Sequence, residues 1–253
     1  MTYDLDKDFE LFKNRLVKAK EIFYIEEISK TEAYEFVRKY HYLGDAKFFC
    51  EQAFGLFAIH GDQLLGVATF SQPQGIVALK SWFGLTNQDK FVYELSRLCM
   101  LPSLNGTNAT SYLLSGSIKQ LKKQGVIKAI ITLADSHRHV GSIYQVCNFK
   151  YYGLTKKASD FYRADGKVNP RGKCGSWHGV YLPRTRKHRY AYVLDDSLKV
   201  LYDEQPKPTL DDTQKVECCG GTGKVYDSRF DEWYTCPRCN GELKIIEVLK
   251  DAI

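Results

Sequence analysis

The alternation of apolar and polar positions predicts a regular succession of helices and strands in the first half of the chain. Apolar residues at helical spacing indicate a short amphipathic helix over 8–20, and IFYIEEI over 22–28 reads as a strand. Ser29 is a favourable cap for the next helix, which ends in YHYLG over 40–44. Two β-rich segments follow, QAFGLFAIHG and QLLGVATFSQ, and the dipeptide Gly61-Asp62 between them is typical of a hairpin turn.

The same alternation continues in the second half. The β-rich stretch FVYELSRLCML leads through an Asn105-Gly106 loop into a helix over about 107–123, which Gly125 ends. The continuous apolar run IKAIITLA is typical of a strand buried on both faces. A further helix is expected from about Arg138 before FKYYGLT resumes a strand. This order predicts an α/β (α+β) fold in which a mixed central sheet is flanked by helices.

Composition divides the chain into three parts. With 253 residues, 44% of them apolar, it is long enough for one substantial domain and a small appendage. The sequence DEQPKPTLDDTQ is rich in proline and acids, which predicts a linker over 203–214 between a main domain of 1–202 and a small unit of 215–253. No apolar run reaches membrane-spanning length, and the N-terminus is too polar for a secretion signal. We therefore expect a cytoplasmic protein with no membrane partner.

Four of the eight cysteines cluster near the end of the chain, in ECCGGTGKV and CPRCNGEL. These stretches resemble the zinc knuckles of DnaJ-type chaperones, although Val216 stands where a leading cysteine is usual. Two thiolates at the spacing of CPRC can share one tetrahedral zinc ion, and so short a unit has little core of its own. We expect a zinc-ribbon-like unit of structural or DNA-contacting role, with ligands Cys218, Cys219, Cys236 and Cys239.

The formal charge of +6 is unevenly distributed, because basic residues interleaved with aromatic ones gather after residue 155. Cations for phosphates and flat rings for bases are what a surface that binds nucleic acid needs. A solvated loop of a basic protein explains the same run equally well. On the first interpretation the contacts to nucleic acid come from Lys156, Lys157, Arg163, Arg171, Lys173, Arg186, Lys187 and Arg189.

The order of elements, with a helix that carries Tyr144 and ends in Asn148-Phe149, resembles the GNAT superfamily of N-acetyltransferases, where Gly-Phe is usual. Four motifs in the same order, YHYLG, YELSRLCMLP, LADSHRHVGSIYQVCNF and RKHRYAY, resemble more narrowly the phage Mom family. That resemblance implies an enzyme of bacterial host cytoplasm that converts adenine in double-stranded DNA to an N6-carbamoylmethyl derivative and so blocks restriction. The alternative is an ordinary GNAT acetyltransferase acting on a protein, tRNA or small amine.

Asp135 is the first candidate for catalysis, because it ends a central strand, where ligands of open α/β sheets bind. A carboxylate before a helix is also an ordinary cap. Tyr144 could donate a proton to a leaving thiol or could simply pack in the core. The resemblance further implies that His41 and Tyr42 hold an extruded base, although a histidine at a helix end is often only a partner of the helix dipole. Asp135 with a nearby histidine could also bind iron.

The donor is less certain than the fold, because the loop that cradles a pyrophosphate in acetyltransferases is degenerate in CMLPSLNGTNAT. A carbamoylmethyl group contains a nitrogen that acetyl lacks, so acetyl transfer alone cannot make it. An activated glycyl donor, such as glycyl-tRNA, can supply it and is expected beside acetyl-coenzyme A. Glu94 lies three positions before Arg97 and so should face away from it. The residues expected to hold the donor are Arg97, Asn105, Gly106, Thr107 and Ser117.

Overall fold

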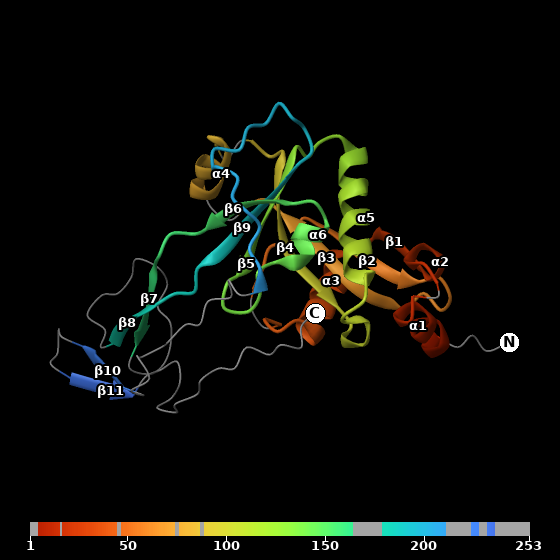
Figure 1. Cartoon of the computed structure of the whole chain (residues 1–253), viewed down its shortest axis with the longest axis horizontal. Coiled ribbons are helices and arrows are strands. Elements are labelled where there is room, and N and C mark those ends of the chain that lie inside the picture. The colour runs from red at the N-terminus through yellow and green to blue at the C-terminus, as the bar shows by residue number, and fades with distance from the viewer. Residues whose placement is uncertain are drawn as a thin grey trace.

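A seven-stranded mixed sheet forms the body of the protein (Figure 1). The structure is a computed structural model, and it describes residues 5–15, 17–44, 47–73, 76–86, 89–163, 179–210, 224–227 and 232–235. The strands of this sheet are β1 (Phe23–Glu27), β2 (Gln52–Ala58), β3 (Leu64–Ser71), β4 (Val92–Met100), β5 (Ala129–Asp135), β6 (Lys150–Leu154) and β9 (Lys187–Val193).

Helices cover both faces of the sheet, and two separate hairpins complete the described part of the chain. The hairpins are β7 (Ser159–Arg163) with β8 (Gly179–Pro183), and β10 (Lys224–Asp227) with β11 (Glu232–Thr235). The helices are α1 (Leu5–Lys13), α2 (Ala19–Ile22), α3 (Lys30–Tyr40), α4 (Ile76–Phe83), the 3-10 turn η1 (Pro102–Leu104), α5 (Ala109–Gln124) and α6 (Ser142–Val146).

The strand order is β1-β2-β3-β4-β5-β9-β6, and every neighbouring pair is antiparallel except β4 with β5. The parallel pair is short, because it stops at the partners Glu94 and Ile131 although both strands continue. The strands therefore diverge beyond that point, and the sheet opens between the second half of β4 and the end of β5.

A β-bulge in β4 accompanies this divergence. Thr69 of β3 pairs with Arg97 and Phe70 pairs with Leu95, so Ser96 is an extra residue on β4. The extra residue shifts the alternation of side chains and brings Glu94 and Arg97 to the same face. The prediction that these two residues face apart was therefore wrong. A bulge cannot be read from the residue pattern of one strand, because it is a property of a pair of strands.

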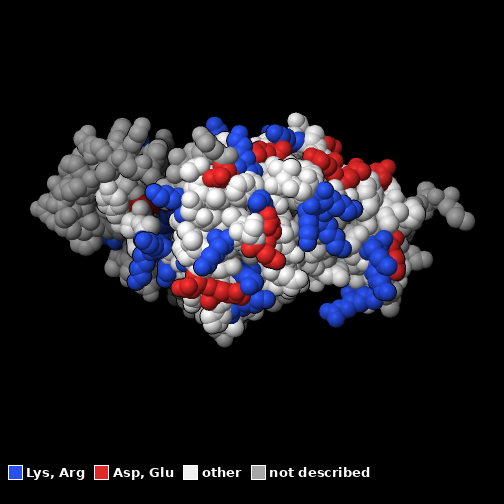
Figure 2. Space-filling model, turned by 90° about the horizontal axis from the view of Figure 1, so that it is seen from above, with Lys and Arg blue, Asp and Glu red and all other residues white. Residues whose placement is uncertain are grey.

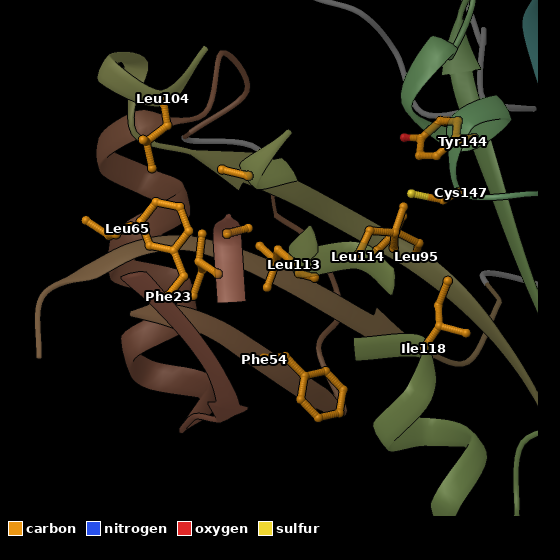
Figure 3. Close-up of a cluster of buried hydrophobic side chains, with 14 of the residues drawn as sticks. Phe23, Phe54, Leu65, Leu95, Leu104, Leu113, Leu114, Ile118, Tyr144 and Cys147 are labelled. Atoms are coloured by element: carbon orange, nitrogen blue, oxygen red, sulfur yellow. The ribbon is translucent and has the colours of Figure 1, made fainter. Parts of the chain in front are cut away.

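The main core lies between the sheet and helices α1, α2, α5 and α6. Figure 3 shows this cluster, in which Cys147, at the end of α6, lies near Leu95 and Leu114. A second layer covers the opposite face, where α3 packs Phe36 and Val37 against the sheet and α4 packs around a different set of strands.

Several local predictions are confirmed. Ser29 Oγ accepts the Glu32 amide and the Ser29 amide donates to Glu32 Oε2, which is a capping box at the start of α3. Gly61 and Asp62 both have positive φ, as an I′-like hairpin turn requires. Gly125 ends α5 in the left-handed conformation. These features depend on neighbouring residues alone, which is why the sequence predicts them.

Other elements differ from their predictions. The helix expected over 8–20 is two helices, α1 and α2, separated by Arg15 with positive φ. The helix expected from Arg138 starts only at Ser142, after a turn and Gly141 with positive φ. Strand β9 was not predicted as a strand, although it lies between β5 and β6 and completes the sheet. Helix α4 was missed as well.

The start of the predicted linker is held against the main domain. The Gln205 amide donates to Tyr151 O at 2.8 Å, and Gln145 Nε2 donates to Pro208 O at 3.0 Å. The four cysteines predicted to bind zinc lie outside the described residues. In the part of the chain that the structure describes, none of the helices is long and apolar enough to cross a membrane.

Candidate active site

The open end of the sheet collects polar side chains from four separate segments, β4, β5, β9 and the turn after α3. Asp135 ends β5, and Lys187 begins β9 directly opposite it in the antiparallel register. Opposed residues of an antiparallel pair share a face, so both side chains lie on the α3 side. Arg97 reaches the same face from β4, and His41 and Tyr42 follow α3. The strands themselves thus build a compact polar site.

The carboxylate of Asp135 is held in one orientation. The His137 amide donates to Oδ1 at 3.1 Å, and Thr185 Oγ1 donates to Oδ2 at 3.2 Å. The carbonyl oxygen of Asp135 accepts the amides of Arg138 and His139, so the chain turns sharply after the strand. Asp135 is therefore the anchor of a turn and not a helix cap, since α6 begins several residues later.

Lys187 is partly buried and lies opposite Asp135 in this site. Burial lowers the pKa of its ammonium group, and the positive charges of Arg184 and Arg97 act in the same direction. The carboxylates of Asp135 and Glu94 oppose that shift. The lowered pKa gives Lys187 a larger share of the neutral amine, the form that can accept a proton.

His41 is a neutral imidazole at physiological pH. Burial, followed by the charges of Arg97 and Arg138, lowers its pKa to about 4. Its Nδ1 accepts the Leu43 amide at 3.0 Å, which places the remaining proton on Nε2. His41 therefore presents a neutral N–H donor to its surroundings.

Tyr42 is an exposed aromatic surface at the mouth of the site, with 54% of its area accessible. The His41 ring stacks on it with centroids 4.4 Å apart, and the Arg138 guanidinium lies 4.3 Å from the ring centroid. Burial of the hydroxyl end raises the pKa of Tyr42. Tyr42, the His41 ring and the Arg138 guanidinium thus form one group of flat side chains, which is suited to contact a planar ligand.

Arg97 is partly buried beneath this group. Its Nη1 donates to the Ser96 carbonyl at 2.7 Å, and its guanidinium lies 4.9 Å from the ring centroid of Phe48. Burial lowers its pKa, and its buried Nε has no hydrogen-bond partner among the described residues. A buried N–H of a cation is costly without an acceptor, so this atom indicates that an anionic or carbonyl group completes the site.

Tyr144 lies on the opposite face of the sheet, within the main core. It is 8% exposed and its ring packs against Phe149 and Tyr190. Burial raises its pKa, and a hydrogen bond with Thr132 partly offsets that shift. Tyr144 is thus separated from Asp135 by the sheet and can meet the same ligand only through the opening between β4 and β5.

The loop before α5 offers a poor cradle for a pyrophosphate. Gly106 has positive φ, but Thr107 Oγ1 accepts the Ala109 amide and so occupies one of the first amides of the helix. Asn105 ends η1, and the side chain of Ser117 is fully buried and donates to the Leu113 carbonyl. Ser117 therefore faces the core and not the loop. The loop thus offers a pyrophosphate fewer free amides than a helix start at which none is engaged.

Sequence comparison gives the chain a family. The model of the Mom protein family matches residues 22–209, which is well over half of the chain. The chain belongs to the Mom protein family. No curated protein matches it significantly.

Solved acetyltransferase structures resemble this Mom-family chain at a low level. The ribosomal-protein-S18-alanine N-acetyltransferase of Escherichia coli has 14% identity and a TM-score of 0.42, and the match covers 69% of this chain and 95% of that one. A Bacillus subtilis acetyltransferase in complex with coenzyme A has 16% identity, a TM-score of 0.40 and coverage of 68% and 97%. A GNAT family acetyltransferase of Elizabethkingia anophelis with acetyl-coenzyme A bound has 11% identity, a TM-score of 0.42 and coverage of 68% and 99%. Likenesses at this level say nothing of this chain's substrate.

The residues predicted to contact nucleic acid differ in their exposure and in their hydrogen bonds. Lys156 and Lys157 are exposed, whereas Arg186 and Arg189 direct their guanidinium groups to backbone carbonyls near β6. Arg163 is partly buried in β7, and Arg171 and Lys173 lie outside the described residues. Figure 2 shows lysine and arginine side chains in small groups with acidic ones between them on the face that it views. Backbone carbonyls thus accept from two nitrogens of Arg186 and from one nitrogen of Arg189.

No group of three or more His, Cys, Asp or Glu side chains within the described ranges is placed to hold a metal ion. Asp135 and its neighbouring histidines therefore do not form such a group, and the predicted cysteine ligands of zinc lie outside those ranges.

Three residues of the site were missed by sequence reasoning. Thr185 orients Asp135, Arg138 contacts Tyr42, and Lys187 was placed on a phosphate-binding surface. Arg138 could have been found from its position between His137 and His139 in the predicted site loop. The sequence gives no comparable indication for Thr185 and Lys187. Strand β9 was not predicted, so its pairing with β5 could not be predicted either.

Proposed function

We propose that this Mom-family chain modifies adenine in double-stranded DNA and gives the N6-carbamoylmethyl derivative, which protects phage DNA from restriction. The observation that carries the proposal is the carboxylate of Asp135, fixed by Thr185 and the His137 amide and placed opposite Lys187 at the open end of the sheet. Membership of the Mom family and the exposed Tyr42 ring beside it support the same assignment.

An adenine turned out of the duplex suits the mouth of this site. The exposed Tyr42 ring and the Arg138 guanidinium offer planar surfaces for the base, and extrusion is the usual way to reach a base atom inside a duplex. Asp135 is an acceptor for the N6 amino group, because each of its oxygens keeps a lone pair beyond the bond it already accepts. His41 adds a neutral N–H donor for a ring nitrogen.

The donor side of the site lies toward Arg97 and the opening between β4 and β5. The buried Nε of Arg97 can bond to the carbonyl or phosphate of a donor. Tyr144 lies across that opening and can order the donor from the far side, where burial keeps its phenol protonated. The donor is then either an acyl-coenzyme A or an activated glycyl group, as in glycyl-tRNA.

A glycyl donor accounts for the product by atom balance. N6 of adenine attacks the glycyl carbonyl, the donor's oxygen leaves, and the N6 proton passes to the leaving group through the site. The free glycyl amine then attacks C6 and the original C6–N6 bond breaks, so that N6 becomes the terminal amide nitrogen and takes a proton from the attacking amine. The result is an isomer of the first adduct, the carbamoylmethyl derivative. Lys187, whose pKa burial lowers, can relay these protons.

The test is mass spectrometry of nucleosides from plasmid DNA of a bacterial host that expresses the chain. We expect a deoxyadenosine heavier by one glycyl unit with the unaltered protein, and its loss with Asp135→Asn. The matched control is Asp62→Asn in the β2–β3 turn, where positive φ suits asparagine. Unmodified DNA from folded, well-expressed protein would overturn the proposal and favour acyl transfer to a protein, tRNA or small amine.

A further inference from the structure

A groove of about 610 Å³ lies on the flank of α3, outside the site described above. It is bounded by one side of that helix and by the segment that follows the turn after it. Its size is that of a site for a small organic ligand or a nucleotide. The lining residues are Thr31, Tyr34, Glu35, Arg38, Gly44, Lys47, Phe48 and Phe49.

The groove and the active site share a wall. The Phe48 ring lies 4.9 Å from the Arg97 guanidinium on the site side, and its centroid is 4.5 Å from that of Tyr34 on the groove side. Tyr34 donates its hydroxyl hydrogen to the Phe48 carbonyl at 2.8 Å, which holds the wall in place. A ligand in the groove is therefore one aromatic ring away from Arg97.

The rim of the groove exposes a large aromatic ring. Phe49 is 63% accessible, although burial of a phenylalanine side chain away from water is favourable in free energy. Tyr34, which also lines the groove, is 40% accessible. Exposed aromatic rings that line one groove are typical of a contact with a partner.

The charges of the groove indicate which partner. Arg38 and Lys47 bring cations to it from two different segments, against the single carboxylate of Glu35. Aromatic rings between cations are the combination that binds unstacked nucleotides, with bases on the rings and phosphates on the cations. A purely apolar groove would instead favour a protein segment.

We propose that this groove binds the DNA nucleotides next to the target adenine, with one unstacked base on the Phe49 ring and phosphates on Arg38 and Lys47. The inference rests on the proposed function, because turning adenine out of a duplex leaves a neighbouring or opposite base without its stacking partner. The groove supplies the lost stacking and holds the strand so that the target base reaches Tyr42.

The first experiment measures binding of a fluorescein-labelled duplex oligonucleotide that contains adenine. We expect Phe49→Ala to weaken binding roughly tenfold, as loss of one base–aromatic stack does. Phe49→Trp keeps a flat ring, so it should bind as the unaltered protein does, and DNA should quench its added indole emission. Val126→Ala removes a side chain of similar exposure far along the sequence and is the control. Unchanged binding by Phe49→Ala, or an unquenched Phe49→Trp, overturns the proposal.

The cations are tested by salt dependence. Arg38→Gln with Lys47→Gln should lower the slope of log affinity against log salt by about 2, since each phosphate contact contributes about 0.9. The control pair is Lys119→Gln with Lys123→Gln on α5, where both lysines are exposed. Equal slopes for the two pairs would contradict the proposed phosphate contacts.

Failure of this inference is distinguishable from failure of the proposed function. If the unaltered chain leaves DNA unmodified in cells but Phe49→Ala weakens binding, the function fails and the groove stands. If the unaltered chain modifies DNA and Phe49→Ala binds and modifies equally well, only the groove fails. A change of sedimentation with Phe49→Ala and no change of DNA affinity would assign the groove to a second copy of the chain and overturn the proposal.

Discussion

At the scale of single residues, Lys187 shows how tertiary pairing changes the role of a side chain. In the sequence it is one of several basic residues in RKHRYAY, yet in the structure it stands opposite Asp135. Burial and two arginines lower its pKa, while Asp135 and Glu94 oppose that change. A lysine with a lowered pKa beside a fixed carboxylate is suited to move protons.

Replacing Lys187 therefore tests a catalytic role separately from DNA binding. We expect Lys187→Met to lower the yield of modified deoxyadenosine roughly 100-fold, the usual loss when a proton-transfer group is removed. Lys187→Arg should not restore the yield, because arginine cannot lose its proton. Duplex affinity, measured in parallel, should change little. A yield of Lys187→Met equal to that of the unaltered chain would rule out proton transfer by this residue.

His41 predicts a pH dependence of stability. Its folded pKa of about 4 lies below the ordinary value of 6.5, so the unfolded chain binds the proton more readily. The contribution of neutral His41 is complete above pH 6.5 and is lost as the pH falls toward 4. The free energy of unfolding should fall between pH 6.5 and pH 4, and we expect His41→Asn to reduce that fall by on the order of 1 kcal/mol. Urea titration at several pH values measures it. An identical pH profile for both proteins would contradict this origin of the shift.

At the scale of elements, the turn between β5 and α6 decides where Tyr144 lies. Gly141 starts α6 with positive φ, and a Cβ there would lie 2.7 Å from the Tyr190 ring and 2.9 Å from the Tyr144 ring. The Tyr190 hydroxyl also donates to the Val140 carbonyl next to this glycine. The glycine is thus required both by conformation and by the close approach of two rings.

A pair of substitutions separates these two requirements. Gly141→Ala should lower the free energy of unfolding by about 3 kcal/mol, because it combines backbone strain with overpacking. Gly125→Ala carries the same kind of strain at φ +71 but meets no atom within 4 Å, so it should cost about 1 kcal/mol. Urea unfolding of the two variants measures the difference. Equal losses would show that the contacts with Tyr144 and Tyr190 are unimportant.

The elements that sequence reasoning predicted well are those determined by adjacent residues. The capping box of Ser29 and Glu32 starts α3 where expected, and the turn at Gly61-Asp62 joins β2 to β3. Helix α6 was predicted too long because apolar residues at helical spacing also occur in the turn before it. Residues with positive φ, Gly141 and Asn148, lie on either side of the helix.

At the scale of the whole molecule, basic and acidic side chains alternate in small groups over the face that Figure 2 views. Arg186 and Arg189, two of the residues predicted to contact DNA, bond to the protein's own backbone. Within the part of the chain that the structure describes, Lys156 and Lys157 are the exposed members of that predicted set. Electrostatic attraction to DNA should therefore arise from a few exposed lysines and from the α3 groove.

Lys156→Gln with Lys157→Gln should lower the slope of log affinity against log salt by about 2, with the loss spread evenly over DNA sequences. The expected reason is the loss of two phosphate contacts that carry no base information. Fluorescence anisotropy over a range of salt concentrations measures the slope. Lys13→Gln with Lys20→Gln, both exposed near the N-terminus, is the matched control. A slope equal to that of the control pair would exclude these lysines from the interface.

The sequence by itself determined the mixed α/β class, the helix after Ser29, the hairpin at Gly61-Asp62 and the position of Asp135 at a strand end. These depend on local periodicity, capping and turn chemistry. Only the tertiary structure decided that Lys187 stands opposite Asp135 and that a bulge at Ser96 brings Glu94 to the side of Arg97. The reason is physical, since strand register and bulges depend on pairing between segments far apart in the chain, and one segment's pattern contains no record of its partner.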